Sequence, residues 1–108
     1  MRRTELTWII LQLNAEIDSG STASIDEVED QIEAGSLFTW LRDRYPGLDL
    51  SVVTAPGYGD ADGILAGLQQ LLGGYRGSER RKWGVENNGL CLLLAWTNEL
   101  IQQHAYCD

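Results

Sequence analysis

Residues 11–18 alternate apolar and polar side chains in the order Leu, Gln, Leu, Asn, Ala, Glu, Ile and Asp. Such strict alternation is typical of a half-buried strand, because successive side chains of an extended chain point to opposite faces. Upstream, Trp8, Ile9 and Ile10 are all apolar, as in a strand that is covered on both faces. We therefore predict a strand over residues 5–17.

A helix over residues 5–17 is the alternative interpretation. It would bury the residues that recur at helical spacing, which are Leu6, Ile9, Leu13 and Ile17. The alternation and the β-branched pair Ile9-Ile10 favour the strand. The choice between strand and helix at this segment decides the fold class of the chain.

Residues 48–54 give a second strand signal, because Leu48, Leu50 and Val52 alternate with other side chains. A strand, a helix and a second strand in this order predict a right-handed crossover with parallel pairing. The chain is therefore expected to be α/β (α+β), a two-layer domain with a small, at least partly parallel sheet and three to four helices. Its length suits a single domain over residues 1–108.

The helix between the two predicted strands has clear boundaries. Ser24 and Glu27 form a capping box, in which the hydroxyl and the carboxylate satisfy free backbone N–H groups. The pair Gly35-Ser36 divides this helix, and Pro46-Gly47 ends its second part. Two further helices are expected. One is capped by Asp60 and stopped by Gly73-Gly74, and the other spans residues 88–104.

The formal net charge of the chain is −8, from 16 acidic and 8 basic residues. An acidic field repels phosphate groups, so we expect no nucleic-acid partner and no membrane partner. The same field attracts basic protein surfaces. The sequence shows no signal peptide and no apolar run of membrane-spanning length, so we predict a cytoplasmic protein.

The sequence contains few residues that could form a catalytic or metal-binding site. Its two cysteines and one histidine lack the spacing of a metal site or of a nucleophile–base pair. We therefore predict no enzyme, no catalytic residue, no metal and no cofactor. The one candidate small-ligand site is the loop over residues 55–62, which joins the second predicted strand to a helix, where ligands of open α/β sheets often bind.

Two clusters are candidate binding residues. The acidic cluster lies on the helix that Ser24 begins, and it consists of Glu27, Glu29, Asp30 and Glu33. The basic cluster precedes the last helix and consists of Arg80, Arg81, Lys82 and Trp83. Carboxylates with no Lys or Arg nearby in the sequence suit a partner with a basic surface. An aromatic side chain beside arginine is typical of interface hot spots. A merely solvated helix face and a charged surface loop are the alternatives.

Several segments also resemble a known family. They are Ser36-Leu37-Phe38-Thr39-Trp40-Leu41-Arg42, the predicted strands, Ala55-Pro56-Gly57, the helix from Gly63 to Gly74, and Leu94-Ala95-Trp96. Together they resemble the effector-associated constant component domains of bacterial conflict systems. The stretch over residues 75–86 departs from that pattern as an insertion. The resemblance implies a non-enzymatic adaptor that couples to effector proteins.

Together, the residues and the resemblance predict a non-catalytic protein–protein interaction module, and the resemblance implies that it is an adaptor in bacterial defence or signalling. One alternative is an acidic inhibitor, either an immunity protein or a phage-encoded antagonist, that blocks a basic protein surface. Another is a small-ligand-binding domain that uses the 55–62 loop. The expected partner is another protein, with a homodimer as one option, formed by pairing of exposed sheet edges or by burial of Trp83.

Overall fold

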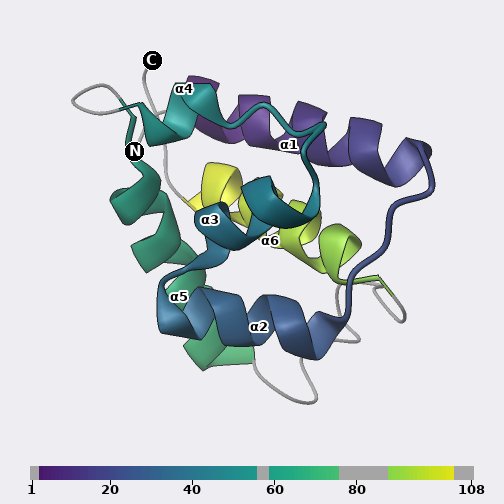
Figure 1. The fold of residues 1–108 in the computed structure, drawn as a ribbon. Coiled ribbons are helices and arrows are strands. Elements are labelled where there is room, and N and C mark those ends of the chain that lie inside the picture. The colour runs from purple at the N-terminus through teal and green to yellow at the C-terminus, as the bar shows by residue number, and fades with distance from the viewer. Residues whose placement is uncertain (1–2, 56–58, 76–87, 104–108) are drawn as a thin grey trace.

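The computed structural model describes residues 3–55, 59–75 and 88–103, and within these ranges all regular secondary structure is helical (Figure 1). In chain order the helices are α1 (Arg3–Asp18), α2 (Ile25–Ala34), α3 (Leu37–Arg44), α4 (Ser51–Thr54), α5 (Ala61–Tyr75) and α6 (Gly89–Gln103). Because the described residues contain no strand, the predicted α/β (α+β) class with its partly parallel sheet is wrong. A homodimer formed by pairing of sheet edges loses its basis as well.

The predicted strand over residues 5–17 is part of helix α1. Leu6, Ile9 and Leu13 are buried, and their spacing of three and four residues places them on one helical face. A strand would have put Leu11 on the same face as Leu13, but the Leu11 side chain is 58% exposed. The alternative helix, which was not favoured, is therefore the correct interpretation.

The predicted strand over residues 48–54 is a loop followed by the short helix α4. The Asp49 carboxylate begins the turn. It accepts hydrogen bonds from the Ser51 hydroxyl (2.6 Å) and backbone N–H (3.1 Å), which lower the pKa of Asp49. The Asp49 backbone is tied to α1, because its carbonyl accepts from Trp8 Nε1 (2.6 Å) and its N–H donates to Gln12 Oε1 (3.0 Å). These backbone groups therefore bond to α1 side chains instead of a neighbouring strand.

The boundaries predicted for α2 are confirmed. The Ser24 hydroxyl accepts a hydrogen bond from the Glu27 backbone N–H (3.4 Å), as an N-cap does. Gly35 ends the helix with a φ of 80°, a left-handed conformation that glycine adopts without a steric cost, and α3 follows almost at once. The cap at Asp60 is confirmed too, because its carboxylate accepts from the Gly63 N–H (3.2 Å).

Helix α6 is the central element of the fold. It was expected over residues 88–104 and spans Gly89–Gln103, so this prediction is confirmed. Figure 1 shows α6 passing behind α3, between α1 and α2. Its buried residues are Gly89, Leu90, Leu92, Leu93, Trp96, Thr97 and Leu100. A helix that is apolar on most sides is stable only when other helices cover it, and α1, α2 and α5 do so.

The N-terminus of α6 is joined to the loop that precedes α2. The Gly89 N–H donates to the Ala23 carbonyl (2.7 Å). The Asn88 side-chain oxygen accepts from the backbone N–H of Ala23 (3.2 Å) and of Leu90 (3.0 Å), and its amide donates to the Ser21 carbonyl (3.2 Å). Asn88 therefore caps α6 and holds this loop with one side chain.

Glycine is required at position 89 because the start of α6 lies very close to the start of α2. A Cβ atom there would lie 2.7 Å from both the Ser24 carbonyl oxygen and Val28 Cγ2. Nearby, the Tyr45 hydroxyl donates to the Thr22 carbonyl (2.6 Å), so α3 holds the same loop. Among the described helices, none is long and apolar enough to cross a membrane.

We predict that Gly89→Ala lowers the free energy of unfolding by about 1–3 kcal/mol, because the added methyl group forces α6 away from α2. Gly74→Ala is the matched control, since a Cβ atom at Gly74 meets nothing within 4 Å. The control is expected to stabilise the protein by up to about 1 kcal/mol, through the helix propensity of alanine. Urea unfolding followed by circular dichroism measures both effects. Equal stabilities of the two variants would contradict the close contact.

Candidate functional site

The acidic cluster predicted from the sequence lies on α2, whereas the basic cluster of Arg80, Arg81, Lys82 and Trp83 lies outside the described residues. Within the acidic cluster the four carboxylates do not share one environment. Asp30 and Glu33 are exposed, but Glu29 is only 4% exposed. Glu27 is half-buried and accepts a hydrogen bond from Trp40 Nε1 (3.0 Å). Glu27 and Glu29 are therefore part of the helix packing.

The exposed carboxylates of α2 form a stripe that the sequence-based cluster did not isolate. It consists of Asp26, Asp30 and Glu33, which are spaced by four and three residues and lie along one side of the helix. The same spacing could have identified the stripe from the sequence, once Val28 and Ile32 were assigned to the opposite, buried face. Asp26 belongs to the surface although the predicted cluster omitted it.

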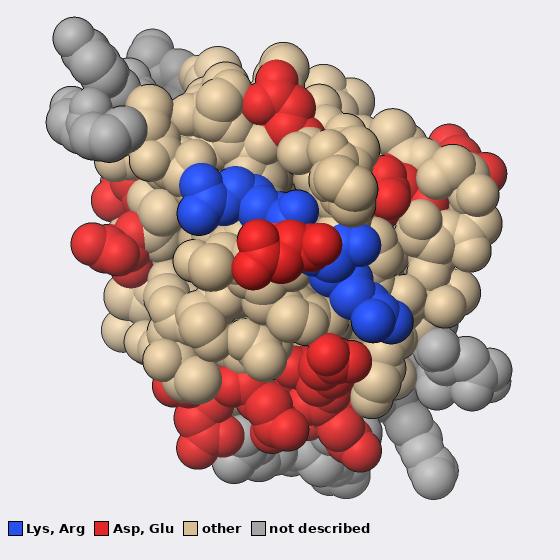
Figure 2. Space-filling view, in the orientation of Figure 1, with Lys and Arg blue, Asp and Glu red and all other residues tan. Residues whose placement is uncertain are grey.

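Helix α3 adds charged side chains next to this stripe. Arg42, Asp43 and Arg44 are exposed in its last turn. Figure 2 shows the basic side chains crossing the middle of this face, over α3, and carboxylates gathering along its lower edge, over α2. We call the exposed residues Asp26, Asp30, Glu33, Arg42, Asp43 and Arg44 the α2–α3 surface.

The two helices of the α2–α3 surface are fixed relative to each other. Besides the bond between Trp40 and Glu27, the Ser36 hydroxyl donates to Gln31 Oε1 (2.6 Å). The pKa of Arg44 is raised from its ordinary value, first by a side-chain hydrogen bond with Tyr45 and then by electrostatic interaction with Tyr45 and Glu27. Arg44, like any arginine, is cationic, and these contacts link it to Tyr45 and to Glu27 of α2.

The 55–62 loop, the sequence-based candidate for a small-ligand site, borders a shallow depression of ≈ 310 Å³. Residues 56–58 lie outside the described residues. The lining residues are Val53, Thr54, Ala55, Gly59, Asp60, Ala61 and Asp62. The Asp60 carboxylate bonds to the Gly63 N–H, so its role in the structure is that of a helix cap.

Reactive and metal-binding groups are sparse in the described part of the chain. Across residues 3–55, 59–75 and 88–103, no three His, Cys, Asp or Glu side chains gather closely enough to hold a metal ion. Cys91 is a free, half-buried thiol, and His104 lies outside the described residues.

No protein-family model, curated protein or solved structure matches this chain significantly. The resemblance to the effector-associated constant component domains stays a prediction. The two predicted strands included in that resemblance are helical or irregular in the structure, as α1 and the segment that contains α4.

We predict that Trp40→Phe lowers the free energy of unfolding by about 1 kcal/mol, because the indole N–H that bonds to Glu27 is lost while an aromatic ring remains. The measurement is a double-mutant cycle with Glu27→Ala, using urea unfolding of the four proteins. The two substitutions are expected to be non-additive, since each removes the same hydrogen bond. Additive effects would show that the Trp40–Glu27 bond does not stabilise the α2–α3 pair.

Proposed function

We propose that this chain is a non-catalytic, cytoplasmic interaction module that binds a basic protein surface through its α2–α3 surface. The observation that carries the proposal is the stripe of exposed carboxylates along α2, formed by Asp26, Asp30 and Glu33. A stripe at this spacing presents its charges in a row, so a partner with a row of basic side chains can meet all three.

The stripe belongs to a wider acidic excess, since the chain has 16 acidic and 8 basic residues. The acidic residues outside the described ranges are Glu79, Glu86 and Asp108. Within the described ranges, the basic residues are Arg3, Arg42 and Arg44. A field of this sign draws a basic partner in over roughly one Debye length, about 8 Å at physiological salt.

The arginines of α3 make the charge of the α2–α3 surface uneven, with acidic side chains along α2 and basic side chains on α3. An exposed ion pair contributes little affinity by itself, so the charges act mainly on association rate, orientation and choice of partner. A partner that fits has basic side chains facing α2 and an acidic group facing Arg42 or Arg44. A uniformly basic surface would meet repulsion from α3.

Two biological roles would use this surface. One is the adaptor in bacterial defence or signalling that the sequence resemblance implies, which would couple to an effector protein through this surface. The acidic stripe equally suits the second candidate, an inhibitor that blocks a basic protein surface. An inhibitor competes with the partner's own anionic ligand, whereas an adaptor binds without that competition, so competition assays on the captured partner separate the two roles.

We predict that the double variant Asp26→Lys/Asp30→Lys weakens binding of the partner at least about tenfold, because like charges then face each other across the interface. The tagged chain is used to capture proteins from the native host, and Kd is measured for the purified partner by biolayer interferometry. Wild-type affinity is expected to fall as salt is raised from 50 to 300 mM, about the range over which exposed charges become screened.

The matched control is Asp18→Lys/Asp62→Lys, which changes the net charge equally at exposed sites on α1 and α5. Asp62 and Asp26 both lie in the first turn of a helix, so each reversal loses a similar interaction with the helix dipole. The control is expected to bind like the wild type. If reversing the charges of Asp26 and Asp30 leaves the partner's affinity unchanged, or if the control lowers the affinity equally, the proposed binding role of the α2–α3 surface is refuted.

A further inference from the structure

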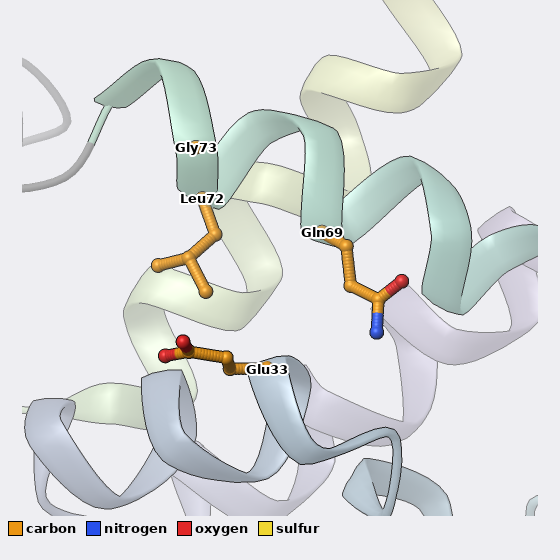
Figure 3. Close-up of a pocket in the computed structure, with 4 residues that line it drawn as sticks. All are labelled: Glu33, Gln69, Leu72 and Gly73. Atoms are coloured by element: carbon orange, nitrogen blue, oxygen red, sulfur yellow. The ribbon is translucent and has the colours of Figure 1, made fainter.

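The depression between α2 and α5 belongs to the packing of the chain. It has a volume of ≈ 360 Å³, and its described lining residues are Glu33, Gln69, Leu72 and Gly73 (Figure 3). Gln69 Nε2 donates a hydrogen bond to the Ile32 carbonyl (3.0 Å), so this side chain links α5 to α2. Leu72 is only 4% exposed and therefore presents little apolar surface to another molecule.

Exposed apolar side chains are found instead on α1 and α4. Among the described residues, the most exposed large hydrophobic side chains are Leu11 of α1 (58%) and Val52 of α4 (37%). The two helices lie in contact, and Trp8 and Gln12 of α1 hydrogen-bond to the backbone of Asp49, just before α4. Both exposed side chains therefore stand on elements that are fixed to each other. We call the exposed residues Thr7, Leu11, Asn14, Ala15, Ser51 and Val52 the α1–α4 face.

The α1–α4 face carries no charge, although the net charge of the chain is −8. From position 4 to position 15, α1 contains one charged residue, Glu5, and its side chain is only 1% exposed. At the borders of the face, the Asp49 carboxylate accepts hydrogen bonds from Ser51, and the Glu16 carboxylate accepts one from the Ser21 hydroxyl (3.1 Å). An uncharged surface can be removed from water without the penalty of burying a charge.

The spacing of side chains along α1 suits contact with an identical helix. Thr7, Leu11 and Ala15 are four residues apart and form one ridge of the helix. In an antiparallel pair with a two-fold axis at Leu11, residue 7 of one copy faces residue 15 of the other. Small side chains then meet on both sides of the two leucines. The helices can therefore approach closely and bury both leucines.

We propose that the α1–α4 face is the interface of a homodimer, in which α1 packs antiparallel to α1 of a second copy. Two chains with a net charge of −8 repel each other, and this repulsion is least where neither chain presents a charge. A basic partner gains no ion pair on this face, whereas a second copy brings an uncharged surface of matching shape. The occupant that these charges favour is therefore a second copy of this chain.

The dimer leaves the α2–α3 surface of both copies accessible, because α1 and α2 lie at opposite edges of the molecule (Figure 1). Two such surfaces on one particle bind a partner with repeated basic sites more tightly than a single surface, since the second contact forms at a high effective concentration. The dimer itself does not depend on the proposed binding function, because the two surfaces share no residue.

The direct test is sedimentation equilibrium of the full chain from about 5 to about 500 μM. The mass is expected to rise from the 12.0 kDa of one chain toward twice that value. One exposed leucine and one exposed valine per copy suit a weak, reversible dimer, with a Kd on the order of 10–100 μM. A single species of 12.0 kDa at the highest concentration would overturn the proposal.

Matched variants locate the interface. Leu11→Lys is expected to raise the dimer Kd at least about tenfold, because it buries two like charges at the two-fold axis. Leu11→Ala, which removes apolar contact without adding charge, is expected to raise it at least about threefold. Gln70→Lys is the control, since it adds the same charge at an exposed position of α5, and it is expected to keep the wild-type Kd. Because Leu11 is exposed in one chain, the variants are expected to retain the helical circular dichroism of the wild type. A dimer that persists in Leu11→Lys, or is lost equally in the control, overturns this interface.

Chemical cross-linking tests the position of the two-fold axis. The two native cysteines are first removed with Cys91→Ser/Cys107→Ser. In that chain, a short bismaleimide is expected to join two copies of Leu11→Cys and to leave Gln70→Cys as single chains on a denaturing gel. Equal cross-linking of the two variants would overturn a two-fold axis at Leu11.

The response to salt separates the dimer from the binding of a basic partner. Raising salt from about 50 to about 300 mM screens the repulsion between two acidic chains, so the dimer Kd is expected to fall about twofold or more. The same change is expected to weaken binding through the α2–α3 surface, which rests on opposite charges. A dimer that salt weakens would be held by ion pairs, and the uncharged interface would be overturned while the α2–α3 surface stands. Conversely, a chain that dimerises as expected but captures no basic partner refutes the binding function alone.

Discussion

The joint between the N-terminus of α6 and the loop before α2 is the constraint on which the rest of the arrangement depends. Asn88 and Gly89 form four hydrogen bonds there, three to backbone atoms of Ser21 and Ala23 and one to the Leu90 N–H. These bonds bring residues more than 60 positions apart into direct contact, and glycine allows the approach that a Cβ atom would prevent. Because α6 is central, fixing its start fixes how α1, α2 and α5 cover it.

This joint also decides which side of α2 faces solvent. Val28 packs against the start of α6, and Ile32 continues the same buried face. With that face buried, the helical repeat leaves Asp26, Asp30 and Glu33 on the outside. The stripe is therefore a consequence of one orientation of α2, and its last member, Glu33, lies where α2 passes α5.

The sequence predicted α2, α5 and α6 as helices, whereas α1 and residues 48–54 were wrongly predicted as strands. Ser24, Gly35 and Asp60 cap or end helices through groups within four residues, so the local pattern contained the needed information. In α1, alternation and helical spacing coincide, and the exposure of Leu11 and Ala15, which a strand would place on the same face as buried Leu13, separates them. An exposed leucine is common on protein surfaces, so the sequence gives no warning of it. In residues 48–54, the decisive bonds come from Trp8 and Gln12 on α1.

The candidate site illustrates the same limit at the level of single side chains. The acidic cluster was placed on the correct helix, yet Glu27 and Glu29 are drawn into packing, and Asp26 replaces them at the surface. The composition gives the number of carboxylates on α2. Which of them reach solvent depends on how the helix is turned about its axis, and the buried positions determine that orientation. The depression that Glu33, Gln69, Leu72 and Gly73 line could not be predicted at all, because the packing of α2 on α5 brings these residues together. A surface assembled from two helices becomes visible only once the contact between them is known.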